Sequence, residues 1–87
     1  MRLADYLRPL GRPERERLAA VCGTTYPHLR NVAFSGKPCG EKLAVAIEQN
    51  TSSDVRRWDC RPSDWWEIWP ELIGTKGAPR VPMKKAA

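Results

Sequence analysis

The sequence predicts an all-α fold, a bundle of about five short helices followed by a flexible basic C-terminal tail. Apolar residues recur every three or four positions in several short segments, which is the spacing of one helix face. Segments rich in Gly, Pro, Ser and Asn separate these stretches, and no stretch has a strand signal. At 87 residues the chain is one small domain, expected over residues 1–73, with the tail over residues 74–87.

The first two predicted helices lie near the N-terminus. The first spans about residues 2–8, and its apolar face consists of Leu3, Tyr6, Leu7 and Leu10. The second begins at Pro13, a favoured first-turn residue, and ends at Gly23, which adopts a positive φ at no steric cost. Its buried side is expected to consist of Leu18, Ala19, Val21 and Cys22.

The third and fourth predicted helices are separated by a loop over residues 35–38. Thr25 is a plausible N-cap for the third helix, over residues 26–33. Its inward residues are expected to be Leu29, Val32 and Ala33. The fourth helix spans about residues 41–49, and its apolar stripe consists of Leu43, Ala44 and Ile47.

A short turn is expected around residues 55–58, before the fifth helix, which starts at Ser63 or Asp64 and ends near Trp69. This helix has the i, i+3, i+4, i+7 pattern of a buried face, made of Trp65, Ile68, Trp69 and Leu72. From Gly74 onward the chain is rich in Gly and Pro and buries too little apolar surface to order itself, which predicts a flexible arm.

The charge distribution indicates a polyanionic partner. Residues 1–37 carry a net charge of +4, residues 38–73 carry −3, and residues 74–87 carry +4 without an acidic residue. Between Glu16 and Glu41 there is no acidic side chain at all. Such a window is typical of a surface that binds nucleic acid, although in a stretch this short it can also arise by chance.

The cysteine and histidine content argues against a metal centre and against catalysis. Cys22, Cys39 and Cys60 are far apart, without a C-x-x-C pair, and His28 is the single histidine. We expect free thiols, no metal, no cofactor and no enzymatic activity. The absence of a long apolar run predicts a cytoplasmic protein without a membrane span.

The segment from Pro13 to Ala33 has the pattern of a helix-turn-helix. Two crossing helices need a small residue at their contact and a turn residue without a Cβ, and the second helix must bury one side and leave the other free for the major groove. The residues that fit these requirements at the right spacing are Ala19, Gly23, Thr25, Leu29 and Val32.

Over about residues 2–72 the chain resembles the Cro/C1-type helix-turn-helix proteins, a lambda-repressor/Cro-like fold, and within them the YdaS-like branch. The resemblance is carried by LAAVCGTTYPHLRNVAFSGKPCGEKLAVAIEQNT, by the I-E-x-x-T motif at residues 47–51, and by residues 60–65 and 68–72, CRPSDW and IWPEL. It implies a small repressor-type DNA-binding regulator of phage, prophage or mobile-element origin. Family members are often labelled antitoxins.

The chain departs from the family pattern at four positions around the turn. Thr24 stands where the family usually has an aliphatic residue, and His28 where it has a small one. Tyr26 and Pro27 occupy two exposed first-turn positions that are usually polar, so they offer few donors for reading bases.

Candidate DNA contacts lie on and around the third helix. The candidates for reading bases are Tyr26, Pro27, Arg30 and Asn31. Arginine to guanine is the commonest specific contact, and asparagine can bond adenine. Tyr26 could pack on a thymine methyl group or instead cover the helix junction. The phosphate-binding candidates are Thr25, Ser35, Lys37, Arg15 and Arg17.

Two further groups of residues have expected roles. The tail cations are candidates for non-specific DNA contacts: Lys76, Arg80, Lys84 and Lys85. The tryptophans are expected to form core or dimer contacts: Trp58, Trp65, Trp66 and Trp69. Their acidic surroundings disfavour a base-stacking platform.

The sequence thus predicts a sequence-specific double-stranded DNA-binding regulator that acts by occupying an operator. One recognition helix reads only a few base pairs, so we expect a homodimer on a pseudo-palindromic operator. The competing interpretation is a protein-interaction module, such as an antitoxin or inhibitor, with a protein partner.

Overall fold

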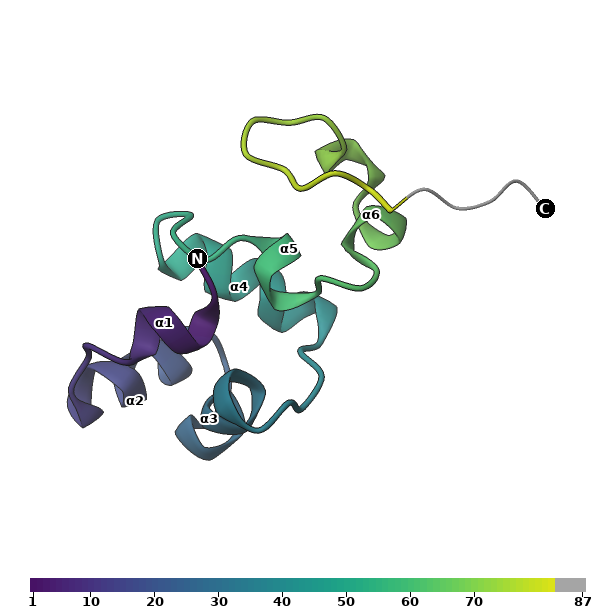
Figure 1. The fold of residues 1–87 in the computed structure, drawn as a ribbon. Helices are drawn as coiled ribbons and strands as arrows, with labels where there is room; N and C mark the ends of the chain where they lie inside the picture. Colours follow the sequence, from purple (N-terminus) through teal and green to yellow (C-terminus); the bar gives the residue numbers. More distant parts are fainter. Residues whose placement is uncertain (83–87) are drawn as a thin grey trace.

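The computed structural model describes residues 1–82, and their regular secondary structure is entirely helical (Figure 1). The elements in chain order are α1 (Leu3–Leu7), α2 (Arg12–Val21), α3 (Tyr26–Phe34), α4 (Glu41–Asn50), α5 (Arg57–Cys60), α6 (Trp65–Ile68) and the 3-10 helix η1 (Pro70–Leu72). The predicted fold class, a small all-α helix-turn-helix bundle, is confirmed for these residues.

The turn between α2 and α3 is built as the sequence predicts. Gly23 has φ +77°, a left-handed conformation that favours glycine. The N–H of Gly23 donates to the carbonyl of Ala20 at 3.0 Å, and the N–H of Thr24 donates to that of Ala19 at 2.9 Å. These two bonds satisfy carbonyls at the end of α2, as in a Schellman motif. The hydroxyl of Thr25 accepts from the N–H of His28 at 3.3 Å, so Thr25 is the N-cap of α3.

One apolar cluster joins the helices. Its buried members are Leu3, Leu7, Leu18, Ala19, Leu29, Cys39, Ala44, Ile47, Val55, Trp58, Trp65, Trp69 and Leu72. Most of the residues predicted to face inward are therefore buried. Val21 is an exception: its side chain is 55% exposed, because no helix of residues 1–82 covers that end of α2.

The expected turn at residues 55–58 is wrong, because a short helix, α5, forms there. Asp59 accepts a hydrogen bond from the backbone N–H of Arg56 at 2.8 Å, which caps the first turn of α5. The burial of Val55 and Trp58 holds the segment against the core. The tertiary contacts of these residues thus stabilise a helix that their local sequence does not announce.

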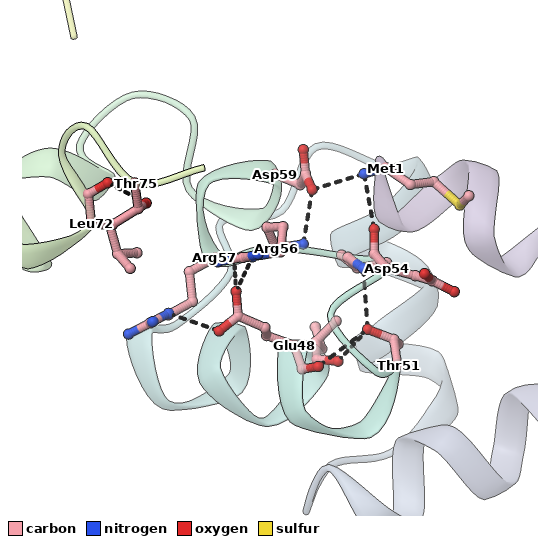
Figure 2. Close-up of polar contacts among 11 residues, drawn as sticks. Met1, Glu48, Thr51, Asp54, Arg56, Arg57, Asp59, Leu72 and Thr75 are labelled. Carbon is pink, nitrogen blue, oxygen red and sulfur yellow. Dashed lines mark hydrogen bonds and ion pairs between the residues drawn. The ribbon is translucent and has the colours of Figure 1, made fainter. Parts of the chain in front are cut away.

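A salt-bridge clamp between α4 and α5 consists of Glu48, Arg56 and Arg57 (Figure 2). One Glu48 oxygen accepts from Nε of Arg56 at 2.6 Å and from the backbone N–H of Arg57 at 3.3 Å. The other oxygen lies 3.0 Å from Nε of Arg57, an ion pair without a well-directed hydrogen bond. The two guanidinium groups also lie over aromatic rings, Arg56 over Trp58 and Arg57 over Trp69.

The C-terminal part of the described chain is shorter in its helices than predicted. Because Pro70 has no N–H to donate, α6 ends at Ile68 and the 3-10 helix η1 follows. Trp58 and Trp65 pack edge to face with ring centroids 5.6 Å apart, and Trp65 and Trp66 do so at 6.0 Å.

Residues 74–82 form turns that lie back against the domain (Figure 1). Ala78 and Val81 pack on the apolar cluster, and the hydroxyl of Thr75 donates to the carbonyl of Leu72 at 2.6 Å (Figure 2). The predicted boundary at Gly74 therefore does not separate the helical domain from a segment without contacts to it. Lys84 and Lys85 lie outside the described residues, and the flexibility of the tail stays a prediction.

Candidate nucleic-acid interface

The exposed side of α3 carries an arginine between two aromatic residues. Tyr26, Arg30 and Phe34 follow each other at intervals of four residues, so they lie along one stripe of the helix. Arg30 is exposed, the Phe34 side chain is 42% exposed, and Tyr26 is half-buried. Pro27 is exposed beside this stripe. The buried side of α3 is formed around Leu29, which has no exposed surface.

Three arginines from α1 and α2 lie against the aromatic rings of this stripe. The guanidinium carbons of Arg8 and Arg15 each lie 5.9 Å from the centroid of the Phe34 ring. That of Arg12 lies 5.9 Å from the Tyr26 ring. These distances are at the outer range of a cation–π contact. Together the six residues form what we call the basic–aromatic face: Arg8, Arg12, Arg15, Tyr26, Arg30 and Phe34.

Arg15 also fixes the corner at which α1, α2 and α3 meet. Its guanidinium donates to the carbonyl of Leu10 at 3.0 Å, to that of Arg8 at 3.2 Å and to the hydroxyl of Tyr26 at 3.2 Å. Of the two roles left open for Tyr26, the structure shows that it covers the helix junction. Arg15 has a structural role that its assignment as a phosphate contact did not include.

The remaining arginines of the face differ in how free they are. Arg8 pairs with Asp5, and Nε of Arg12 pairs with Glu16 at 3.2 Å. Both pairs are between exposed side chains, and such pairs contribute little to stability and exchange readily. Arg30 has no hydrogen bond and no ion pair with any of residues 1–82, so its guanidinium keeps all its donors available.

The other predicted phosphate contacts are divided between two places. Thr25, Ser35 and Lys37 are exposed at the two ends of α3, and Lys37 has no ionic partner within the described chain. Arg17 is two residues from Arg15 and so points to the opposite side of α2. There it lines a shallow groove of about 290 Å³ with Tyr6, Leu10, Glu14, Leu18, Val21 and Asn50. The structure does not bring Arg17 to the face that carries the α3 stripe.

Asn31 and the tryptophans have mostly local or buried positions. Asn31 is half-buried, and its backbone carbonyl accepts from the N–H groups of Ser35 and Lys37 at 2.9 and 3.2 Å. Trp58, Trp65 and Trp69 are in the core, and Trp66 is half-buried against it. The core role expected for the tryptophans is therefore the one observed within this chain.

Sequence analysis missed Phe34, Arg8 and Arg12. The spacing of Tyr26, Arg30 and Phe34 was visible in the sequence and was the signal that could have identified Phe34. No such signal exists for Arg8 and Arg12, because only the packing of α1 and α2 on α3 brings them to its rings.

Neither the family models nor the curated protein sequences contain a match to this chain. No helix within residues 1–82 has the length and apolar character needed to cross a membrane. In the same residues, no group of three or more His, Cys, Asp and Glu side chains is arranged to hold a metal ion.

Proposed function

We propose that this protein is a cytoplasmic transcription regulator that binds a specific site on double-stranded DNA and represses by occupying it. The observation that carries the proposal is Arg30, an exposed arginine without an ionic partner among residues 1–82, in the middle of the second helix of a helix-turn-helix. The resemblance to the Cro/C1-type proteins of the YdaS-like branch supports the same function.

In this proposal α3 enters the major groove with its exposed stripe. Arg30 donates two hydrogen bonds to O6 and N7 of a guanine, the commonest specific protein–DNA contact. Pro27 and Phe34 flank it and supply apolar contacts, which suit thymine methyl groups. Asn31 reaches a neighbouring base from the edge of the stripe. Repression needs no chemistry, since a protein bound across a promoter excludes polymerase.

Phosphate contacts position the helix in the groove. Arg8 and Arg12 can exchange their exposed carboxylate partners for phosphates, and Thr25, Ser35 and Lys37 stand at the two ends of α3. One such module reads few base pairs, so we propose that two copies bind a pseudo-palindromic operator as a dimer.

The decisive experiment compares Arg30→Ala with Arg17→Ala in binding to a site selected from a random duplex pool. We expect Arg30→Ala to weaken specific binding by about 1–3 kcal/mol and to leave binding to random DNA nearly unchanged. Arg17→Ala removes the same charge from an exposed residue on the opposite side of α2, so it controls for the loss of charge. Equal losses on specific and random DNA would assign Arg30 to the phosphate contacts.

A second candidate function is a protein-interaction module, such as an antitoxin or inhibitor. It is favoured by Phe34, a large apolar side chain that is 42% exposed, and by Pro27, which has no donor to offer a base. An electrophoretic mobility shift against random duplex at several salt concentrations separates the two functions. A DNA-binding protein shows binding that weakens steeply with salt, and an interaction module shows none.

A further inference from the structure

Two cysteines that are distant in the sequence meet at one cavity. Cys39 lies in the loop between α3 and α4, and Cys60 is the last residue of α5. Both line a cavity of about 440 Å³. The cavity reaches the surface, because the exposed residues Lys37 and Ser63 form part of its wall. Cys22, the third cysteine, does not line it.

The thiols of Cys39 and Cys60 form a hydrogen-bonded pair, and all three cysteines are free. The hydrogen bond from Cys60 lowers the pKa of Cys39, and the positive charge of Arg61 acts in the same direction against the effect of burial. The same hydrogen bond raises the pKa of Cys60, and burial raises it further. Cys39 is thus the sulfur that ionises, and Cys60 the one that keeps its proton.

Arg61 holds this arrangement in place. Its guanidinium donates to the backbone carbonyl of Cys39, and it is anchored by Asp64, whose carboxylate accepts from Nη2 at 2.6 Å and from Nε at 3.0 Å. The guanidinium therefore links the α3–α4 loop to the segment between α5 and α6. The two sulfurs are presented to each other by structure on both sides.

We propose that Cys39 and Cys60 are a redox-active dithiol, a modification site at which a small peroxide forms an intramolecular disulfide. The site is a pair of thiols in hydrogen-bond contact at the wall of a cavity large enough to admit hydrogen peroxide. A thiolate next to a second thiol is the arrangement in which sulfenic acid is resolved to a disulfide.

The reaction has two steps. The Cys39 thiolate attacks one peroxide oxygen and the O–O bond breaks, which gives a Cys39 sulfenic acid and a hydroxide that takes the thiol proton of Cys60. The Cys60 thiolate then attacks the Cys39 sulfur. The S–S bond forms, the S–O bond breaks, and the departing hydroxide takes a proton from water. Overall two thiols and one hydrogen peroxide give one disulfide and two waters, so both sulfurs are oxidised and both peroxide oxygens reduced.

The disulfide would tie the loop that follows α3 to the end of α5. It closes a chain segment of about 20 residues, and a cross-link of that length stabilises a small domain mainly by restricting the unfolded chain. The oxidised protein should therefore melt at a temperature higher by roughly 10–25 °C, and a thiol reductant should reverse the change. This inference concerns the fold and does not depend on DNA binding.

The test treats the reduced full-length chain with hydrogen peroxide and measures intact mass, disulfide-linked peptides and the melting temperature. We expect a mass loss of two hydrogens, a linked peptide that joins Cys39 to Cys60, and the reversible rise in melting temperature. Cys22→Ser is the matched control and should behave like the wild type. Products that only gain oxygen, or a disulfide that includes Cys22, would overturn the proposal.

The Cys60→Ser variant tests the assigned roles. We expect it to lose the disulfide and to accumulate a Cys39 sulfenic acid, which dimedone labels. If the variant is labelled at Cys22 and not at Cys39, then Cys39 is not the sulfur that reacts. Because the linkage is mapped in the wild type, the conclusion does not depend on how well this variant folds.

Discussion

Arg15 shows how a charged residue on a candidate binding surface can serve the fold. Its guanidinium donates to two backbone carbonyls and to the Tyr26 hydroxyl, so it holds the ends of α1 and α2 against the start of α3. Arg12, three residues before it, has only an ion pair with Glu16 between exposed side chains. The two arginines belong to one face and should differ in what their removal does.

We predict that Arg15→Ala lowers the free energy of unfolding by about 1–3 kcal/mol, because it leaves the carbonyl of Leu10 without its partner. Arg12→Ala should change it by less than about 1 kcal/mol. Urea denaturation of both variants measures the difference. Similar small losses in both would mean that the contacts of Arg15 do not stabilise the corner.

At the scale of elements, the clamp at Glu48 explains how a four-residue helix persists. An isolated helix as short as α5 is unstable in water, because nucleation fixes several residues for very few hydrogen bonds. Here Glu48 of α4 accepts from Arg56 and the N–H of Arg57, and it pairs with the side chain of Arg57. The Glu48 side chain is 12% exposed, so these interactions are only partly screened by solvent.

We predict that Glu48→Ala destabilises the protein by about 1–3 kcal/mol, because it leaves two partly buried arginines without their carboxylate. The matched control is Glu41→Ala in the same helix. Its carboxylate is 62% exposed and lies 4.0 Å from Arg61, so its loss should cost less than about 1 kcal/mol. Thermal or urea unfolding of the two variants gives the comparison, and equal values would contradict a role for the clamp.

At the scale of the whole molecule, positive charge gathers at both ends of the chain and negative charge in the middle. In the C-terminal segment Lys76 and Arg80 are exposed, and Ala78 and Val81 attach this segment to the core. Deleting residues 74–87 would therefore remove packing as well as charge. Charge substitution separates the two effects.

We predict that the double variant Lys76→Gln and Arg80→Gln reduces the slope of log K against log salt for DNA binding by roughly 1–2 units, because each neutralised phosphate releases counterions. The selected consensus site should stay the same. Removing residues 83–87 tests Lys84 and Lys85 in the same measurement. Unchanged slopes in both proteins would indicate a solubilising tail, and a changed consensus would indicate readout through the minor groove.

The sequence by itself determined the features that depend on neighbouring residues. Gly23 and Thr25 place the turn and the start of α3, because a positive φ and an N-cap are requirements of one or two residues. The buried stripe around Trp65 and the exposed position of Arg30 follow from the 3.6-residue period of a helix. These requirements are met within a turn or two of chain, so they can be read without a structure.

Only the tertiary structure decided the features that depend on how the helices pack. The pairing of Cys39 with Cys60 and the stability of α5 arise from contacts between residues distant in the chain. The same packing brings Arg8 to Phe34 and turns Arg17 away from that face. Local preferences are silent on such matters, since burial of the apolar cluster sets which helix faces meet and thereby which polar side chains at their edges come together.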